Sequence, residues 1–425
     1  MKTVTAFIVL LSIGSAWSGA REVPRSEGGV RAQVHEEPVA LSLAEITAIV
    51  LEHNHVLLAA KSMVDGARAG VRTAQALGNP KFEWHQGQWQ PTALTRQQAS
   101  GWSLAQPIEN PYARRARIDA AESTFSISGW GVSISRNEII AQVHTKAYEA
   151  LLYQSEAESA SENLALLEQV RERIRVRVQT GEAPRYEMIK ADAEVIHARE
   201  RQQTARLQSD QALLELNRLA AGRLPLRWKL TDSFQTMPDM PELAQLQQSA
   251  QSHNPELNSL AIELERAQAQ LQSARAGRWP GLEIRYSDTR EPEVRQNTWG
   301  VVVQVPLLDQ RAGPMAEAQA DVERIRTRLE GRRQELNHQI QLACRTLEIA
   351  RLRVEALSQG VIHEAEAALR VAQAAYRYGE RGILDVLDAQ RVLRAARSDL
   401  LQARFQWHAA RIMIDQLTGR FVNPA

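Results

Sequence analysis

The sequence predicts a mainly helical protein with a small β part, built from two copies of one helix–strand–strand–helix unit. Two observations carry this prediction: long runs of apolar residues spaced by three and four, and an internal duplication. The 425 residues are rich in Ala, Leu, Gln, Arg and Glu and only 5% aromatic, a composition that favours long helices. With 51 basic and 50 acidic residues, the chain as a whole has no charge excess to attract nucleic acid or acidic lipid.

The duplication relates residues 43–83 to residues 243–283 without a gap. Each copy reads helix, strand, loop, strand, very long helix, turn and helix, and the turn glycine Gly181 is echoed by Gly379. The period of about 200 residues is longer than that of common solenoid repeats. The expected organisation is a first repeat over 41–222, a proline-containing linker over 223–241, a second repeat over 242–419 and a tail over 420–425. The matching residues include Leu43 and Leu243, His53-Asn54 and His253-Asn254, Leu57 and Leu257, Ala67 and Ala267, and Pro80 and Pro280.

The N-terminus has the pattern of a secretory signal peptide over residues 1–20. Lys2 precedes a short apolar stretch, and Ser18-Gly19-Ala20 suits a cleavage site. A buried N-terminal helix is the alternative. Residues 21–40 are polar and expected to be disordered. No cysteine follows the cleavage site, so a lipid anchor there is not expected; the single Cys344 cannot form an intrachain disulfide.

The helical stretches have coiled-coil spacing. In the last one, apolar residues alternate by three and four from Val386 to Leu417, with Ala at alternate positions that allow close packing. The stretch from about Pro314 to Tyr378 would be roughly 100 Å long as one helix. A rod of the cytoskeletal type has the same spacing, but the predicted strands argue against a rod.

Four segments alternate in polarity as strands do. Leu282, Ile284 and Tyr286 share one face of a strand, and tryptophans such as Trp84 and Trp299 lie in or beside these segments. After the signal there is no apolar run of about 18 residues, so a membrane crossing would have to be a β-barrel. A soluble two-hairpin sheet remains the alternative. Because membrane barrels need about eight strands or more, four strands per chain would require oligomerisation.

The segment from Tyr376 to Ala389 carries a Tyr-x-x-Gly turn followed by Leu-Asp-Val-Leu-Asp-Ala. Together with the duplicated halves, it resembles the TolC-like outer-membrane efflux channels over residues 41–419. The resemblance implies a homotrimer in the outer membrane of a Gram-negative bacterium. Three chains of four strands would form a twelve-stranded barrel, and the long helices an α-barrel tunnel in the periplasm. It also implies a periplasmic adaptor and an inner-membrane pump as partners.

Within that family the chain looks most like the branch serving cobalt–zinc–cadmium (heavy-metal) resistance. The expected function is therefore passive conduction of substrate, metal cations by this resemblance, from pump and adaptor to the exterior. A channel for drugs or secreted proteins and a periplasmic coiled-coil adaptor are the alternatives. The branch resemblance rests on Asn79-Pro80-Lys81-Phe82-Glu83, Gln106-Pro107-Ile108-Glu109 with Arg114-Arg115, and Val305-Pro306-Leu307-Leu308-Asp309.

The family resemblance also identifies a periplasmic gate at the two helical turns. Asp385 and Asp388 match acidic residues that ring the closed entrance, although both could simply favour a helix N-terminus. Tyr376 and Arg381 match residues that hold the gate shut, and Glu187 is their expected acidic partner. An incidental surface ion pair is the alternative for Arg381 and Glu187. The turns at Gly181 and Gly379 would form the tip that contacts the adaptor.

No enzyme is expected. The sequence has no metalloprotease HExxH motif, no phosphate-binding glycine loop and no nucleophile elbow, and no cofactor is implied. His53 and His55 are two residues apart and do not share a helical face, so no metal site is predicted there. One segment conflicts with the pattern: Ser128-Gly129-Trp130-Gly131 would break the first long helix if it fell within it.

Overall fold

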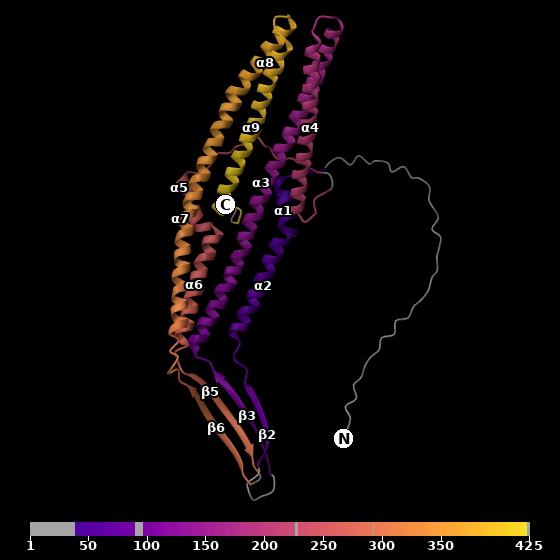
Figure 1. Cartoon of the computed structure of the whole chain (residues 1–425). Coiled ribbons are helices and arrows are strands. Elements are labelled where there is room, and N and C mark those ends of the chain that lie inside the picture. The colour runs from indigo at the N-terminus through magenta and orange to yellow at the C-terminus, as the bar shows by residue number, and fades with distance from the viewer. Residues whose placement is uncertain (1–38, 90–96, 226–227, 292, 423–425) are drawn as a thin grey trace, which may run out of the picture. The chain divides into compact units, whose positions relative to one another are not determined.

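The structure is a computed structural model that describes residues 39–89, 97–225, 228–291 and 293–422. The proposed signal peptide and residues 21–38 lie outside the described residues. The described residues form one compact unit. Its long helices carry a four-stranded sheet at one end and two helical hairpin tips at the other (Figure 1). The predicted fold class, mainly helical with a small β part and duplicated halves, is confirmed.

The two halves have the same order of elements. The first half consists of β1 (Val39–Leu41), α1 (Leu43–His53), α2 (His55–Gln75), β2 (Lys81–Trp89), β3 (Gln97–Ile108), α3 (Pro111–Gln179) and α4 (Arg185–Leu219). The second consists of β4 (Trp228–Leu230), α5 (Leu243–His253), α6 (Pro255–Ala276), β5 (Gly281–Arg290), β6 (Arg295–Gln304), α7 (Ala312–Ala356), a π-helical turn (Leu357–Val361), α8 (Ile362–Arg377) and α9 (Ile383–Leu417). β1 and β4 pair in parallel.

The first helix of each half is broken at an asparagine, which the sequence pattern did not predict. The Asn54 side chain accepts hydrogen bonds from the first turn of α2 and donates one to the carbonyl of Leu219 at 3.1 Å. Asn254 does the same for α6 and donates to the carbonyl of Leu417 at 2.9 Å. Each asparagine therefore caps one helix and ties it to the end of the last helix of its half.

The first long helix is unbroken. α3 runs for 69 residues straight through Gly129 and Gly131, so the expectation of a break there is wrong. A Cβ at either glycine would meet nothing within 4 Å, and neither position has a positive φ. Glycine lowers helix propensity by only about 1 kcal/mol. The packing of α3 against α2, α4, α6 and α9 outweighs that cost.

The sheet is antiparallel throughout, in the order β2-β3-β5-β6. Its register places Trp84 beside Trp102 and Tyr286 beside Trp299. One face is apolar and exposed; the opposite face carries His85, Ser103 and other polar or small residues. The apolar face includes Phe82, Trp84, Trp102, Leu104, Ile108, Leu282, Ile284, Tyr286, Trp299, Val301 and Val303.

A buried aromatic stack lies where the linker between the halves crosses the helices. His408 is 2% exposed and stacks on Tyr148 at 3.9 Å between ring centroids, and its Nε2 lies 3.3 Å from the carbonyl oxygen of Phe234. Burial lowers the pKa of His408 to about 4 and also that of His144, which contacts the Phe421 ring, to about 4. Both histidines are therefore neutral near pH 7.

Candidate functional site: the two hairpin tips

The tips are two helical hairpins that end in the same kind of turn. Gly181, after α3, and Gly379, after α8, have φ values of 80° and 77°. The next amide reaches back to the helix in each case: Glu182 to the carbonyl of Arg177 at 2.8 Å and Glu380 to that of Ala375 at 2.9 Å. These are Schellman caps, in which glycine is favoured because other residues are strained at positive φ.

An apolar cluster joins the two hairpins behind the tips. Both hairpins contribute to it, and its most buried members, Ile174 and Ile383, are 0% and 1% exposed. The contact between the hairpins therefore has a buried apolar centre, and polar side chains make further contacts at its edge. The buried members are Leu167, Ile174, Ala191, Val195, Ala198, Ile383, Val386 and Leu387.

Tyr376 packs against this cluster. The guanidinium carbon of Arg177, on α3, lies 4.8 Å from the centroid of its ring, which gives a cation–π contact between the hairpins. The Tyr376 hydroxyl is shielded from solvent and has no hydrogen-bond partner among the described residues. A shielded hydroxyl without a partner is energetically costly.

Arg381 and Glu187 do not form an ion pair in the described chain. Arg381 instead lies 3.7 Å from Asp385, on its own hairpin. One carboxylate oxygen of Glu187 is buried without a hydrogen-bond partner among the described residues. The structure thus places Tyr376, Arg381 and Glu187 at the tips but leaves the predicted contact of Arg381 with Glu187 unmade within one chain.

The two aspartates of the expected acidic ring are each paired with an arginine. Asp385 is in the first turn of α9 and contacts Arg381, while Asp388 lies one turn further and contacts Arg391 at 3.1 Å. Neither aspartate caps the helix, since α9 has no side-chain cap hydrogen bond. Within one chain, the negative charges of Asp385 and Asp388 are therefore largely compensated by these arginines.

Two polar contacts between the hairpins were not predicted from the sequence. Arg391 on α9 forms an ion pair with Glu194 on α4. Gln390, only 6% exposed, donates a hydrogen bond to the Asn163 side chain on α3 at 3.0 Å. The partners are 197 and 227 residues apart, so no local spacing could pair them. A glutamine beside the apolar seam of α9 was the one available signal.

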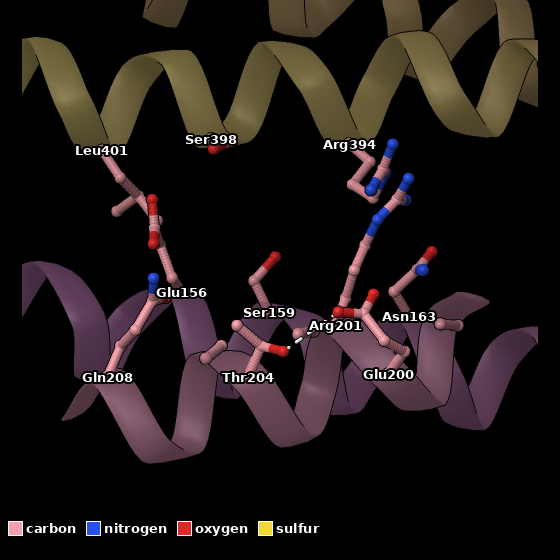
Figure 2. A pocket seen from close by; sticks show the side chains of 13 residues that line it. Glu156, Ser159, Asn163, Glu200, Arg201, Thr204, Gln208, Arg394, Ser398 and Leu401 are labelled. Carbon is pink, nitrogen blue, oxygen red and sulfur yellow. Dashed lines mark hydrogen bonds between the residues drawn. The ribbon is translucent and has the colours of Figure 1, made fainter. Parts of the chain in front are cut away.

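A cavity of about 230 Å³, lined mostly by polar residues, continues the same seam away from the tips. It lies between α3, α4 and α9, and Figure 2 shows Arg201 and Arg394 extending into it from opposite hairpins. Burial raises the pKa of Glu156, which lines its other end. Among the described residues, no group of three or more His, Cys, Asp or Glu is arranged to hold a metal ion.

No single helix in the described part of the chain is both long and apolar enough to cross a membrane. α1 and α2, bent by 46° relative to each other, satisfy the length and composition only when taken together. Ile46, Val50 and Leu57 of this pair are buried in the protein core.

The duplicated halves, the helical hairpins and the sheet with one apolar face define a membrane channel protein of the helical-tunnel type. The model of the outer membrane efflux protein family matches residues 48–222 and 246–420, and the chain belongs to this family of outer-membrane efflux channels. It is accordingly an outer-membrane protein, and the family to which it belongs is one of transport channels. The family resemblance inferred from the sequence is confirmed.

Similar proteins agree with this assignment. The chain is 26% identical to the cobalt-zinc-cadmium resistance protein CzcC of Cupriavidus metallidurans over 387 residues, which cover 89% of this chain and 90% of CzcC. The crystal structure of CusC has a TM-score of 0.78 at 16% identity and covers 93% of this chain and 95% of CusC. A membrane protein of Pseudomonas aeruginosa has a TM-score of 0.78 at 18% identity, with 90% and 91% covered.

Proposed function

We propose that three copies of this chain form a channel that passively conducts metal cations from a periplasmic adaptor and inner-membrane pump to the exterior. The observation that carries the proposal is the four-stranded sheet, whose outer strands β2 and β6 have no neighbour on their outer edges within the described residues. Pairing β6 of one copy with β2 of the next removes these edges. Three copies then close a twelve-stranded barrel.

Exposed apolar stripes on the helices also favour a ring of three copies. Ile189, Ile196, Leu207 and Leu214 lie on one face of α4, and each is 60% or more exposed. α7 has a similar stripe at Leu342, Ile349 and Leu352. A heptad stripe normally faces another helix. Packing α4 of one copy against α7 of the next is a head-to-tail contact, which generates a closed ring when the rotation closes.

The proposed cargo rests on the similarity to a cobalt-zinc-cadmium resistance protein over nearly the whole chain. Conduction of drugs or secreted proteins is the second candidate, because the same fold does not specify its cargo. A periplasmic adaptor is disfavoured, since this chain has two hairpins and a four-stranded sheet with an apolar face.

The hairpin tips form the gate in this proposal. The shielded Tyr376 hydroxyl and one Glu187 carboxylate oxygen have no hydrogen-bond partner among the described residues. Arg381, on the other hairpin, is the expected partner of Glu187. Asp385 and Asp388 line the entrance, with their charge moderated by Arg381 and Arg391. The turns at Gly181 and Gly379 are the surfaces that the adaptor would contact.

The assembly is tested by the mass of the purified protein in mild detergent, where a homotrimer is expected. A monodisperse monomer with native helix content would contradict the proposal. Deletion of the gene, followed by growth on metals, drugs and secretion substrates, tests the cargo. Loss of resistance to divalent metals alone supports metal efflux, whereas sensitivity to drugs alone supports the second candidate.

A further inference from the structure

The four connections between helices and sheet carry five large apolar side chains that are each at least 66% exposed. They are residues 77–81, 108–115, 275–281 and 304–312, and we call them together the junction collar. All four lie where the helices meet the sheet (Figure 1). The exposed fractions are 69% for Leu77, 75% for Tyr112, 66% for Trp279, 76% for Leu307 and 102% for Leu308.

Such exposure is not explained by packing within the chain. Leu307 and Leu308 lie in the bend between β6 and α7. Because they are adjacent in the chain, even an extended strand would bury only one of them on a given face. The collar is continuous with the exposed apolar face of the sheet through Ile108 and Leu282. Leucine, tyrosine and tryptophan beside an apolar band are typical of the boundary between acyl chains and headgroups.

The charge of the collar adds a second observation. Its four segments contain six basic residues and only two acidic ones, although the whole chain is nearly neutral. Lys81, Arg275 and Arg278 are exposed and have no ion-pair partner among the described residues. The excess of positive charge is therefore local and free to bind anions.

A hollow of about 850 Å³ lies between two of the connections. It is lined by residues 77–80, 106–109 and 111, together with Arg114 and Arg115. Arg114 donates to the carbonyl of Gln75 at 2.8 Å, while its Nε is buried and has no partner among the described residues. A buried guanidinium N–H without an acceptor points to an anionic group that the chain does not provide.

We propose that the junction collar binds anionic phospholipids of the inner leaflet of the outer membrane. Leu307, Leu308 and Trp279 enter the boundary between headgroups and acyl chains, and the basic side chains hold the headgroup phosphates. The inference rests on the proposed orientation, in which the sheet is in the membrane and the helices are in the periplasm.

Depth-dependent quenching tests the apolar part. A single cysteine at Leu308, in the Cys344→Ala background, is labelled with an environment-sensitive fluorophore and the assembled protein is placed in bilayers containing brominated lipids. Strong quenching is expected at position 308. The matched control is Val371→Cys, an exposed valine on α8, where only weak quenching is expected. Equal, weak quenching at both positions would overturn the proposal.

Competition between lipids tests the charged part. In mixed bilayers, brominated phosphatidylglycerol should quench the probe at 308 more than brominated phosphatidylcholine at the same mole fraction. Arg275→Gln with Arg278→Gln should lower this preference by about fivefold per charge. Arg206→Gln, an exposed arginine on α4, should leave it unchanged. No lipid preference in the parent protein would overturn the assignment to anionic headgroups.

Both experiments measure lipid contact rather than transport. If a collar variant loses lipid quenching but still conducts ions, the lipid contact and the channel function are separate properties. A protein that shows the lipid contacts but neither forms trimers nor conducts ions would instead refute the proposed function.

Discussion

Arg391 and Glu194 form an ion pair that joins the two helical hairpins although the residues are 197 positions apart. Glu194 is mostly buried, with 18% of its side chain exposed, while about half of Arg391 is exposed. Arg391 also contacts Asp388. One arginine therefore contacts both Glu194 of the other hairpin and Asp388, an acidic residue of the proposed entrance.

Replacing Glu194 with Gln should loosen the tips and raise single-channel conductance or open probability in planar bilayers. A partly exposed ion pair contributes about 1 kcal/mol, and three copies repeat the loss around one opening. The control is Arg397→Gln, which breaks the 2.8 Å pair with Glu366 inside one hairpin and should not change gating. Equal conductance of the Glu194 variant and the parent would show that other contacts hold the tips closed.

The double variant Tyr376→Phe with Arg381→Ser is also expected to conduct more than the parent while remaining trimeric. Phe keeps the ring that Arg177 covers, and Arg381 is exposed, so neither change removes core packing. Planar-bilayer recording and gel filtration measure both properties. Unchanged conductance in a trimeric variant would exclude the gate role assigned to these two residues by family resemblance.

Neutralising Asp385 and Asp388 should lower the preference for cations with less effect on opening. Because Arg381 and Arg391 compensate both carboxylates, the change in reversal potential under a salt gradient should be moderate. Arg381→Gln alone should shift the preference the other way, towards cations, since it exposes the charge of Asp385. A shift of both variants in the same direction would contradict this account.

The buried histidines predict a loss of stability in acid. The pKa values of His408 and His144 are lowered to about 4 in the folded state, so the unfolded chain binds more protons between pH 6.5 and pH 4. Stability should therefore fall as the pH decreases through this window, by about 3 kcal/mol per histidine. The raised pKa of Asp415 opposes this trend at the acidic end, since protonated Asp415 is favoured by burial.

Melting temperature against pH measures this effect. His408→Phe keeps an aromatic ring against Tyr148 and should flatten the dependence, whereas His338→Gln, an exposed histidine on α7, should not. A parent protein equally stable at pH 7 and pH 4.5 would contradict the assignment.

Gly419→Ala should destabilise the protein more than Gly222→Ala, its counterpart in the first half. Both glycines have positive φ, 71° and 76°, and so share a strain of about 1 kcal/mol for alanine. A Cβ at Gly419 would lie 2.4 Å from the carbonyl oxygen of His253, whereas one at Gly222 meets nothing within 4 Å. Denaturant titration of the two variants should separate the clash from the strain; similar losses would show that the His253 region moves freely.

Much of the fold was predictable because its determinants are local and repeated. Heptad spacing identified the hairpins, and the recurrence of His53-Asn54 at His253-Asn254 aligned the halves, even though the capping role of each asparagine was not predicted. The prediction of a break near Gly129 failed because propensity was weighed without the packing of α3. Contacts such as Gln390 with Asn163 were not predictable, since they depend on how two distant hairpins meet.

The hairpins also differ in the continuity of their first helices. α3 is continuous, but α7 meets α8 through the π-helical turn Leu357–Val361, where one extra residue enters the helix. Such turns break the regular hydrogen-bond ladder and are common points of bending. We therefore expect the second hairpin to bend at residues 357–361 while the first hairpin stays straight. Amide exchange in residues 357–361 should then be faster than in the neighbouring part of α3. A change that makes this turn regular helix should slow opening of the tips and leave the apolar contact between the two hairpins unchanged.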